Sequence, residues 1–191
     1  QSIKSPTIRG FNEVVQTIKE VEEKFPQQKH FVSFVTFNSS GIKERLWNQE
    51  VSKLQLIDEN LFQPTSSTPL YDAIGQSIGR LQETISSNGT YNVLVTILTD
   101  GQENSSRNYT QARISRMIEE LKSKSWTFAY IGANQNAERV ARSMAIDNSM
   151  EFETNEEDMK RMFMKEKKAR MNMADQMSKM SMFSENISFN K

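Results

Sequence analysis

The sequence predicts an α/β fold, in which a mostly parallel central sheet carries helices on both faces. Amphipathic segments with helical spacing alternate along the chain with short apolar segments that are typical of strands. The two most apolar segments, residues 92–99 and 126–131, are nearly continuous in their apolar character, as expected for strands that are covered on both sides. With 191 residues, the chain is long enough to form one domain with a substantial core.

The first part of the chain predicts a long helix and then a hairpin. Apolar residues at three- and four-residue intervals indicate an amphipathic helix from residue 8 to about residue 25. Residues 30–37 alternate in polarity and are rich in valine and phenylalanine, which predicts a strand. A turn over residues 38–41 follows, and residues 42–47 are its expected hairpin partner. Residues 51–64 show no clean period, so we expect a loop with some short structure there.

The second part of the chain alternates between helices and strands. Thr68 and Pro69 mark the start of a strong helix, because a threonine hydroxyl accepts an unpaired backbone N–H and proline has no N–H to leave unpaired. The elements expected after this helix are a strand (92–99), a helix (about 109–121), a strand (126–131), a short helix (137–144) and a short edge strand (150–152).

The composition changes near residue 155. Eight of the eleven methionines lie between Met159 and Met182, mixed with lysine and arginine, which predicts a long helix. We therefore divide the chain into a main domain, residues 1–153, and a methionine-rich C-terminal helix, residues 154–191. This helix either closes the domain by packing on it or docks a partner, since methionine surfaces adapt to many shapes. The apolar stripe that would make the contact is Met159, Met162, Phe163, Ala169, Met173, Met177 and Met180.

Charge and composition exclude several classes of function. The 24 basic and 24 acidic residues give no net charge, whereas proteins that bind nucleic acid need a basic face. The absence of cysteine excludes a disulfide framework and a zinc–thiolate site, and it suits a cytoplasmic location. One histidine, His30, leaves little room for imidazole chemistry. No apolar run approaches the roughly 20 residues of a membrane-spanning helix, so no membrane partner is expected.

Two oxygen donors are expected at the carboxyl edge of the sheet, where open parallel sheets bind ligands. Asp100 follows the most apolar strand directly, and Thr68 begins a helix. Carboxylate and hydroxyl oxygens suit Mg²⁺ or Mn²⁺ rather than zinc or copper. From these residues alone the simpler alternatives stay open: Thr68 is explained as a helix cap, and Asp100 as part of an Asp–Gly turn.

Several motifs occur in an order that is typical of one protein family. Residues 68–74 read TPLYDAI, and after a helix the apolar strand ends in Asp100–Gly101. The strand at residues 30–39 and the segment WTFAYIGANQ at residues 126–135 fit the same order. The arrangement resembles a von Willebrand factor A-like domain, of the type found in bacteria and phages, over residues 1 to about 153. The resemblance implies a Rossmann-like three-layer sandwich and a non-catalytic module for protein–protein interaction.

The resemblance also implies a metal-ion-dependent adhesion site at the carboxyl end of the sheet. In that family a threonine of the second motif and an aspartate of the third motif hold the metal, and they match Thr68 and Asp100. The ion, Mg²⁺ or Mn²⁺, keeps one coordination position open for an Asp or Glu side chain of a protein partner. Asn38, Gln102 and Asn104 are expected on the loops around this opening, as part of a partner-binding rim.

The first motif of the family, D-x-S-x-S at the end of the first strand, does not occur in this sequence. Ser2 and Ser5 lack the aspartate and the apolar strand that should precede them. A parallel sheet without its central strand would leave buried N–H and C=O groups unpaired, each at a cost of about 1–3 kcal/mol. We therefore expect another segment, upstream of Gln1 or in another chain, to supply the strand and the motif, and the metal depends on it.

Two other functions stay open at this stage. One is a divalent-metal-dependent enzyme that uses Asp100 to act on a phosphorylated small molecule. The absence of a glycine-rich phosphate loop from the sequence argues against this enzyme. The other is a degenerate, metal-free scaffold that binds its partner through the methionine-rich helix.

Overall fold

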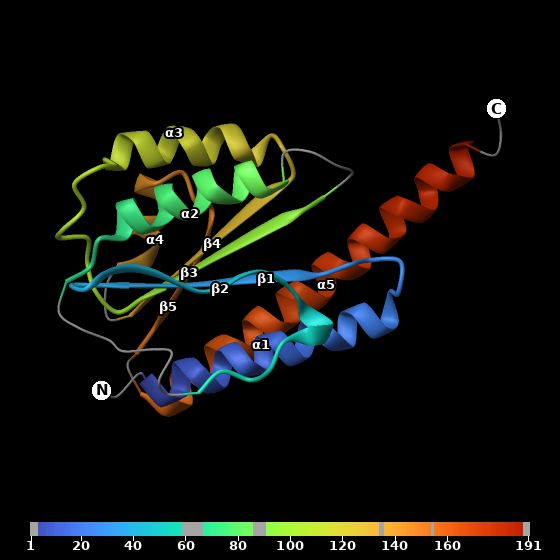
Figure 1. Ribbon diagram of the computed structural model, residues 1–191, viewed down its shortest axis with the longest axis horizontal. Helices are drawn as coiled ribbons and strands as arrows, with labels where there is room; N and C mark the ends of the chain where they lie inside the picture. Colours follow the sequence, from blue (N-terminus) through green and yellow to red (C-terminus); the bar gives the residue numbers. More distant parts are fainter. Residues whose placement is uncertain (1–3, 59–66, 86–90, 134–135, 154, 189–191) are drawn as a thin grey trace. The chain divides into compact units, whose positions relative to one another are not determined.

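The computed structural model describes residues 4–58, 67–85, 91–133, 136–153 and 155–188 (Figure 1). The chain divides into two compact units, and the hairpin near the N-terminus contributes to both. The first unit comprises Gln1–Ser33, Leu46–Phe62 and Asn155–Lys191. The second unit comprises Phe34–Arg45 and Gln63–Thr154.

The second unit contains a parallel three-stranded sheet in the order β3-β4-β5. In this sheet β3 (Val93–Thr99) pairs with β4 (Trp126–Ala133), which pairs in turn with β5 (Asn148–Phe152). Most of β4 is buried, as its continuous apolar character predicts. Among the described strands β3 pairs only with β4, so the other edge of β3 carries no described strand.

Three helices of the second unit supply the rest of its core. They are α2 (Leu70–Ile85), α3 (Gln111–Lys122) and α4 (Ala137–Ser143). The core joins apolar residues of these helices to β3 and β4, and its members include Leu70, Ile74, Ile78, Ile97, Ile114, Ile118, Trp126, Phe128 and Tyr130. Parallel strands that alternate with packed helices define an α/β fold, so the predicted fold class is confirmed.

The predicted hairpin is present and forms a separate two-stranded sheet. It consists of β1 (Phe31–Asn38) and β2 (Gly41–Glu50). The turn between the strands depends on two residues: the Asn38 Oδ1 accepts a hydrogen bond from the Ser40 N–H at 2.8 Å, and Gly41 has a φ of 101°. Such a positive φ is strained for residues with a side chain, which explains the glycine.

The first unit consists largely of α1 (Lys4–Lys24), the short 3₁₀ helix η1 (Val51–Lys53) and α5 (Glu156–Ser188). A small core of Val15, Ile18, Val51 and Leu54 joins α1 to η1. The Asn12 side chain binds the backbone of Ile57, which follows η1. Its Nδ2 donates to the Ile57 carbonyl at 3.0 Å, and its Oδ1 accepts from the Ile57 N–H at 2.9 Å. The remainder of the loop expected up to residue 64 lies outside the described residues from position 59 onward.

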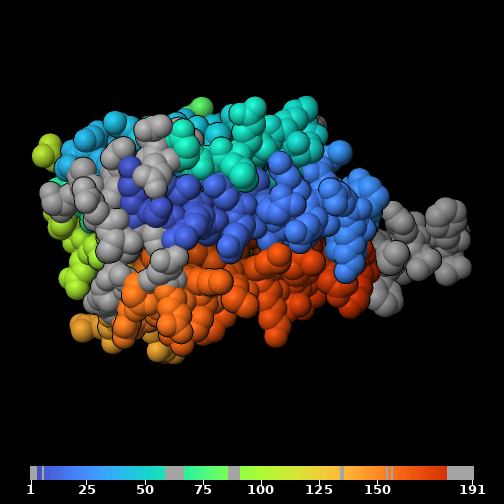
Figure 2. Space-filling model, turned by 90° about the horizontal axis from the view of Figure 1, so that it is seen from below, coloured from blue at the N-terminus to red at the C-terminus, as the bar shows by residue number. Residues whose placement is uncertain are grey.

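The helices α1 and α5 lie side by side in the first unit (Figure 2). They run in the same direction, because Gly10 lies against the Phe163 ring near the start of both helices, whereas Glu20 pairs with Lys167 further along. None of the helices in the described part of the chain is both long and apolar enough to cross a bilayer.

The buried face of α5 differs in part from the expected stripe. Met159, Met162 and Phe163 are buried, as expected, but Ala169 is exposed. The buried face continues through Glu166, Ala174 and Ser178, which are spaced by eight and four residues and so lie on one side of the helix, while Met173 and Met177 are half-buried. The Met180 side chain lies outside the described part of the structure.

His30, which directly precedes β1, makes the stability of the first unit depend on pH. Burial lowers the pKa of its imidazole, Glu22 opposes this effect and Arg170 adds to it, and the net pKa lies below the ordinary value. The folded chain therefore binds a proton less readily than the unfolded chain, in which histidine has a pKa of about 6.5. As the pH falls below that value, the free energy of unfolding is expected to decrease, by at most about 1.4 kcal/mol per pH unit.

This expectation is checked by urea denaturation at a series of pH values between 7 and 5, with His30→Gln as the matched variant. Glutamine is polar and does not titrate, so the slope should be flatter in the variant. If the variant keeps the slope of the wild type, the pH dependence arises from other groups and the assignment to His30 is wrong.

Candidate functional site

Three connections lie at the same end of the second unit: the β1–β2 turn, the start of α2 and the loop after β3 (Figure 1). The loop after β3 begins with Asp100 and continues to Thr110, the cap of α3. The side chains of Asp100 and Gln102 are exposed. The residues expected to form a site are therefore carried by connections at the carboxyl end of the sheet, where ligands of open parallel sheets bind.

Thr68 lies directly against Gly101. A β-carbon at position 101 would come within 2.4 Å of the Thr68 Oγ1, closer than real β-carbons approach another atom, so only glycine leaves room for this hydroxyl. Thr99 fixes the turn that follows β3, because its hydroxyl accepts from the Gly101 N–H at 3.1 Å and donates to the Gly101 carbonyl at 2.9 Å. The structure thus brings Thr68 next to the Asp100–Gly101 turn.

Asn104 holds Thr68 through two reciprocal hydrogen bonds. The Thr68 N–H donates to the Asn104 Oδ1 at 2.9 Å, and the Asn104 N–H donates to the Thr68 carbonyl at 3.2 Å. Asn104 stays exposed, but its side-chain oxygen holds Thr68. Asn38, another residue of the expected rim, shapes the β1–β2 turn through its bond to Ser40.

Two N–H groups in the first turn of α2 are capped by the loop after β3 and not by Thr68. The Tyr71 N–H donates to the Glu103 Oε2 at 2.9 Å, and the Asp72 N–H donates to the Ser106 Oγ at 3.0 Å. The interpretation of Thr68 as the helix cap is therefore wrong. Within the residues that the structure describes, the Thr68 hydroxyl has no hydrogen-bond partner.

Glu103 connects the loop after β3 to α2. Its Oε1 accepts from the N–H groups of Ser105 and Ser106, both at 2.8 Å, and its Oε2 accepts from the Ser106 hydroxyl at 2.7 Å and from the Tyr71 N–H. Burial alone would raise the pKa of Glu103, but these donors outweigh burial, and the pKa lies below its usual value. The carboxylate is therefore charged at neutral pH, close to the positive end of the α2 dipole.

Asp72 holds the second half of the same loop. Its side chain is 5% exposed. The Oδ1 accepts from the N–H groups of Asn108 and Tyr109 at 2.9 and 2.8 Å, and the Oδ2 accepts from the Arg107 N–H at 2.9 Å and the Asn108 Nδ2 at 3.2 Å. Burial would raise the pKa of Asp72, but the donors outweigh it and the pKa is lowered. Asp72 therefore organises the loop as an ionised carboxylate.

The end of the loop packs on α2 through Tyr109. A β-carbon at Gly75 would come within 2.3 Å of the Tyr109 ring, so the glycine lets the ring lie directly on the helix. On α3, the Arg113 guanidinium lies over the same ring, 4.3 Å from its centroid, in a cation–π contact. The loop is thus held at its start by Glu103, in its middle by Asp72 and at its end by Tyr109.

Sequence reasoning missed Glu103 and Ser106, and it explained Asp72 only by its interaction with the helix dipole in the first turn. One signal was available: the first turn of the helix after Thr68 and Pro69 contains no Glu or Gln at the position of a capping box. An acceptor from elsewhere in the chain was therefore needed, although its identity could not be read from the spacing.

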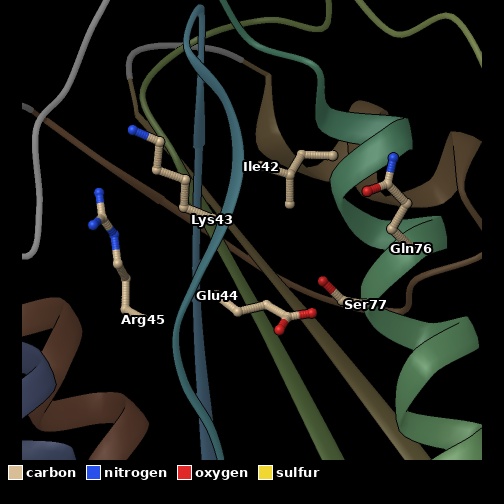
Figure 3. Close-up of a pocket in the computed structure, with 6 residues that line it drawn as sticks. All are labelled: Ile42, Lys43, Glu44, Arg45, Gln76 and Ser77. Carbon is tan, nitrogen blue, oxygen red and sulfur yellow. The ribbon is translucent and has the colours of Figure 1, made fainter.

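A second concave surface lies between β2 and α2. Figure 3 shows Ile42 and Glu44 on the side of β2 that faces α2, with Lys43 and Arg45 on the opposite side. Glu44 forms an ion pair with Arg80, and the Arg45 Nε donates to the Thr36 hydroxyl at 3.0 Å. Because Glu44 and Arg45 already have partners within the protein, we assign no ligand to this surface. Its full lining is Ile42, Lys43, Glu44, Arg45, Gln76 and Ser77.

Thr68 and Asp100 carry the type of donor atom that a divalent cation prefers, but they are too few to complete its coordination shell. Hydroxyl and carboxylate oxygens are hard donors, as Mg²⁺ and Mn²⁺ require. In the described ranges of the chain, no group of three or more His, Cys, Asp or Glu side chains is arranged to hold a metal ion. The octahedral shell of Mg²⁺ needs more donors than these two residues supply, so any metal here depends on further oxygen atoms.

Comparison with known proteins gives one family. The family model of the von Willebrand factor type A domain matches residues 2–167, which include the whole of the second compact unit and part of the first. A search of curated proteins gave no significant match.

Proposed function

This chain belongs to the von Willebrand factor type A domain family, and on that premise we propose that it is a non-catalytic module that binds a protein partner through a divalent metal ion. Domains of this family commonly act in protein–protein interaction. The proposed ion is Mg²⁺ or Mn²⁺, with Thr68 and Asp100 among its ligands. An Asp or Glu side chain of the partner takes the remaining coordination position.

The observation that carries this proposal is that the Thr68 hydroxyl has no hydrogen-bond partner among the described residues. Its hydroxyl does not cap the helix, because Glu103 and Ser106 accept the N–H groups of Tyr71 and Asp72 in the first turn of α2. The hydroxyl lies against Gly101, next to Asp100. A hydroxyl that has no structural partner among the described residues and lies beside a carboxylate-bearing turn supports a role as a ligand.

The other ligands are proposed to come from a strand that ends in a D-x-S-x-S motif and pairs with β3. The outer edge of β3 supports this part of the proposal, since no described strand pairs with it. The two serine hydroxyls and the aspartate of such a motif would add hard oxygen donors to Thr68 and Asp100.

The bacterial or phage origin and the cytoplasmic location stay predictions from the sequence.

The proposal is tested by titrating Mn²⁺ into the purified full-length protein and measuring free Mn²⁺ by electron paramagnetic resonance, with Mg²⁺ as competitor. Thr68→Ala and Asp100→Asn are each expected to weaken binding by at least about tenfold, the effect of losing about 1.4 kcal/mol of interaction with the ion. Asp147→Asn is the matched control, because Asp147 is an exposed residue that pairs with Lys122.

Two results would contradict the proposal. Absence of Mn²⁺ binding by the wild type, or equal affinity in Thr68→Ala, would remove the metal from the function. Steady hydrolysis of a nucleotide or phosphoester with Mg²⁺, lost in Asp100→Asn, would instead establish the enzymatic alternative.

A further inference from the structure

We propose that Glu103 is the positioning residue of the candidate site. Its carboxylate takes over the capping of α2, and it thereby fixes Asn104 and leaves the Thr68 hydroxyl available to a ligand. The inference rests on the proposed function, because the site in question is the one that contains Thr68 and Asp100.

The contacts of Glu103 join two elements that are far apart in the sequence. Its Oε2 accepts from the Tyr71 N–H in the first turn of α2, across 32 residues, while its Oε1 accepts from two N–H groups of its own loop. A single carboxylate thus fixes the loop backbone relative to the start of the helix. The charge strengthens these bonds, since hydrogen bonds to an ionised acceptor are about twice as strong as neutral ones.

The effect of Glu103 reaches Thr68 through Asn104. Asn104 is the next residue in the chain, and it holds both the N–H and the carbonyl of Thr68. Among the described residues the Thr68 hydroxyl accepts from no N–H of α2, and the N–H groups of Tyr71 and Asp72 are paired with the loop instead. Glu103 therefore acts on Thr68 without touching it.

Glu103→Gln tests this inference, because glutamine keeps the size of the side chain but replaces one acceptor oxygen by an NH₂ group that opposes the N–H donors. The matched control is Glu119→Gln, which makes the same chemical change at an exposed position of α3. The full chain is labelled with ¹⁵N, and amide hydrogen exchange is followed by NMR in the wild type and both variants.

The backbone amides of Thr68 and Asn104, neither of which bonds to Glu103, are expected to exchange about tenfold faster in Glu103→Gln. This factor corresponds to a free energy of local opening that is lower by the contribution of about one hydrogen bond. The Tyr130 amide in β4 should change only as much as global stability changes, and Glu119→Gln should match the wild type. If Thr68, Asn104 and Tyr130 all accelerate by the same factor, Glu103 is only a general stabiliser and the inference is wrong. Unchanged exchange at Thr68 and Asn104 would also overturn it.

The Mn²⁺ affinity of Glu103→Gln supplies the functional readout. A weaker affinity, with Thr68 and Asp100 both intact, is the expected result, and equal affinity in variant and wild type would overturn the link between positioning and binding. If the wild type itself binds no Mn²⁺, the proposed function fails, whereas the exchange data still decide whether Glu103 positions Thr68.

Discussion

Asp72→Asn is expected to lower the free energy of unfolding of the second unit by about 3–5 kcal/mol, because each buried donor left without an acceptor costs about 1–3 kcal/mol. The wild-type carboxylate uses both oxygens to accept from three backbone N–H groups and one side-chain amide. Asparagine offers one oxygen, and its NH₂ group would face N–H donors that it cannot pair with.

The measurement is urea unfolding followed by the fluorescence of Trp126, which lies in the core of the second unit, in a Trp47→Phe background. Asp147→Asn is the control, since an exposed ion pair contributes at most about 1 kcal/mol. The lowered pKa of Asp72 adds a second expectation: its contribution is present at neutral pH and is lost as the pH falls through the folded pKa, so the two proteins converge in acid. An effect of Asp72→Asn no larger than that of the control would contradict the assigned role.

Gly10→Ala is expected to destabilise the contact between α1 and α5 by about 1–3 kcal/mol, the usual cost of overpacking a core. The new β-carbon would lie 1.9–2.2 Å from carbons of the Phe163 ring, which is itself buried. This cost is the net expectation even though alanine favours a helix interior over glycine by about 1 kcal/mol.

The chain offers a matched control for Gly10→Ala in Gly79→Ala. Gly79 lies inside α2, and a β-carbon there would meet nothing within 4 Å, so this substitution should be neutral or stabilising. Hydrogen–deuterium exchange of peptides from α1 and α5 measures the effect at Gly10. Adding Phe163→Leu to Gly10→Ala should recover part of the loss, as expected for residues in contact. Purely additive effects in the double variant would show that the Phe163 ring is not what the new methyl group meets.

The elements of the fold could be predicted because they depend on local patterns. The nearly continuous apolar character of residues 92–99 and 126–131 predicted the strands β3 and β4, and their parallel pairing follows from the helix between them. Most of β4 is buried, as expected, whereas most of β3 is only half-buried and its Thr96 is exposed. Element ends were less predictable. The strand β2 continues to Glu50, past the expected end at residue 47, although the polar residues at its end carry no hydrophobic signal.

The site could be predicted only in its outline. Thr68 and Asp100 were expected at one end of the sheet because helix starts and strand ends meet there, and the structure brings Thr68 against the turn that contains Asp100. The role of Glu103 was not predictable, since a hydrogen bond between polar groups 32 residues apart leaves no periodic trace in the sequence. The role of the buried Asp72 in holding this loop was not predictable either, because an acidic residue in the first turn of a helix is already explained by the helix dipole.

The capping of α2 by a distant loop has a consequence for the order of folding. The acceptors for the Tyr71 and Asp72 N–H groups lie 32 and 34 residues further along the chain, so the first turn of this helix is not a local structure. Closing a loop of this length costs chain entropy before any of its hydrogen bonds is gained. We therefore expect the start of α2 and the loop after β3 to form together and late in folding, so that the candidate site assembles as one unit.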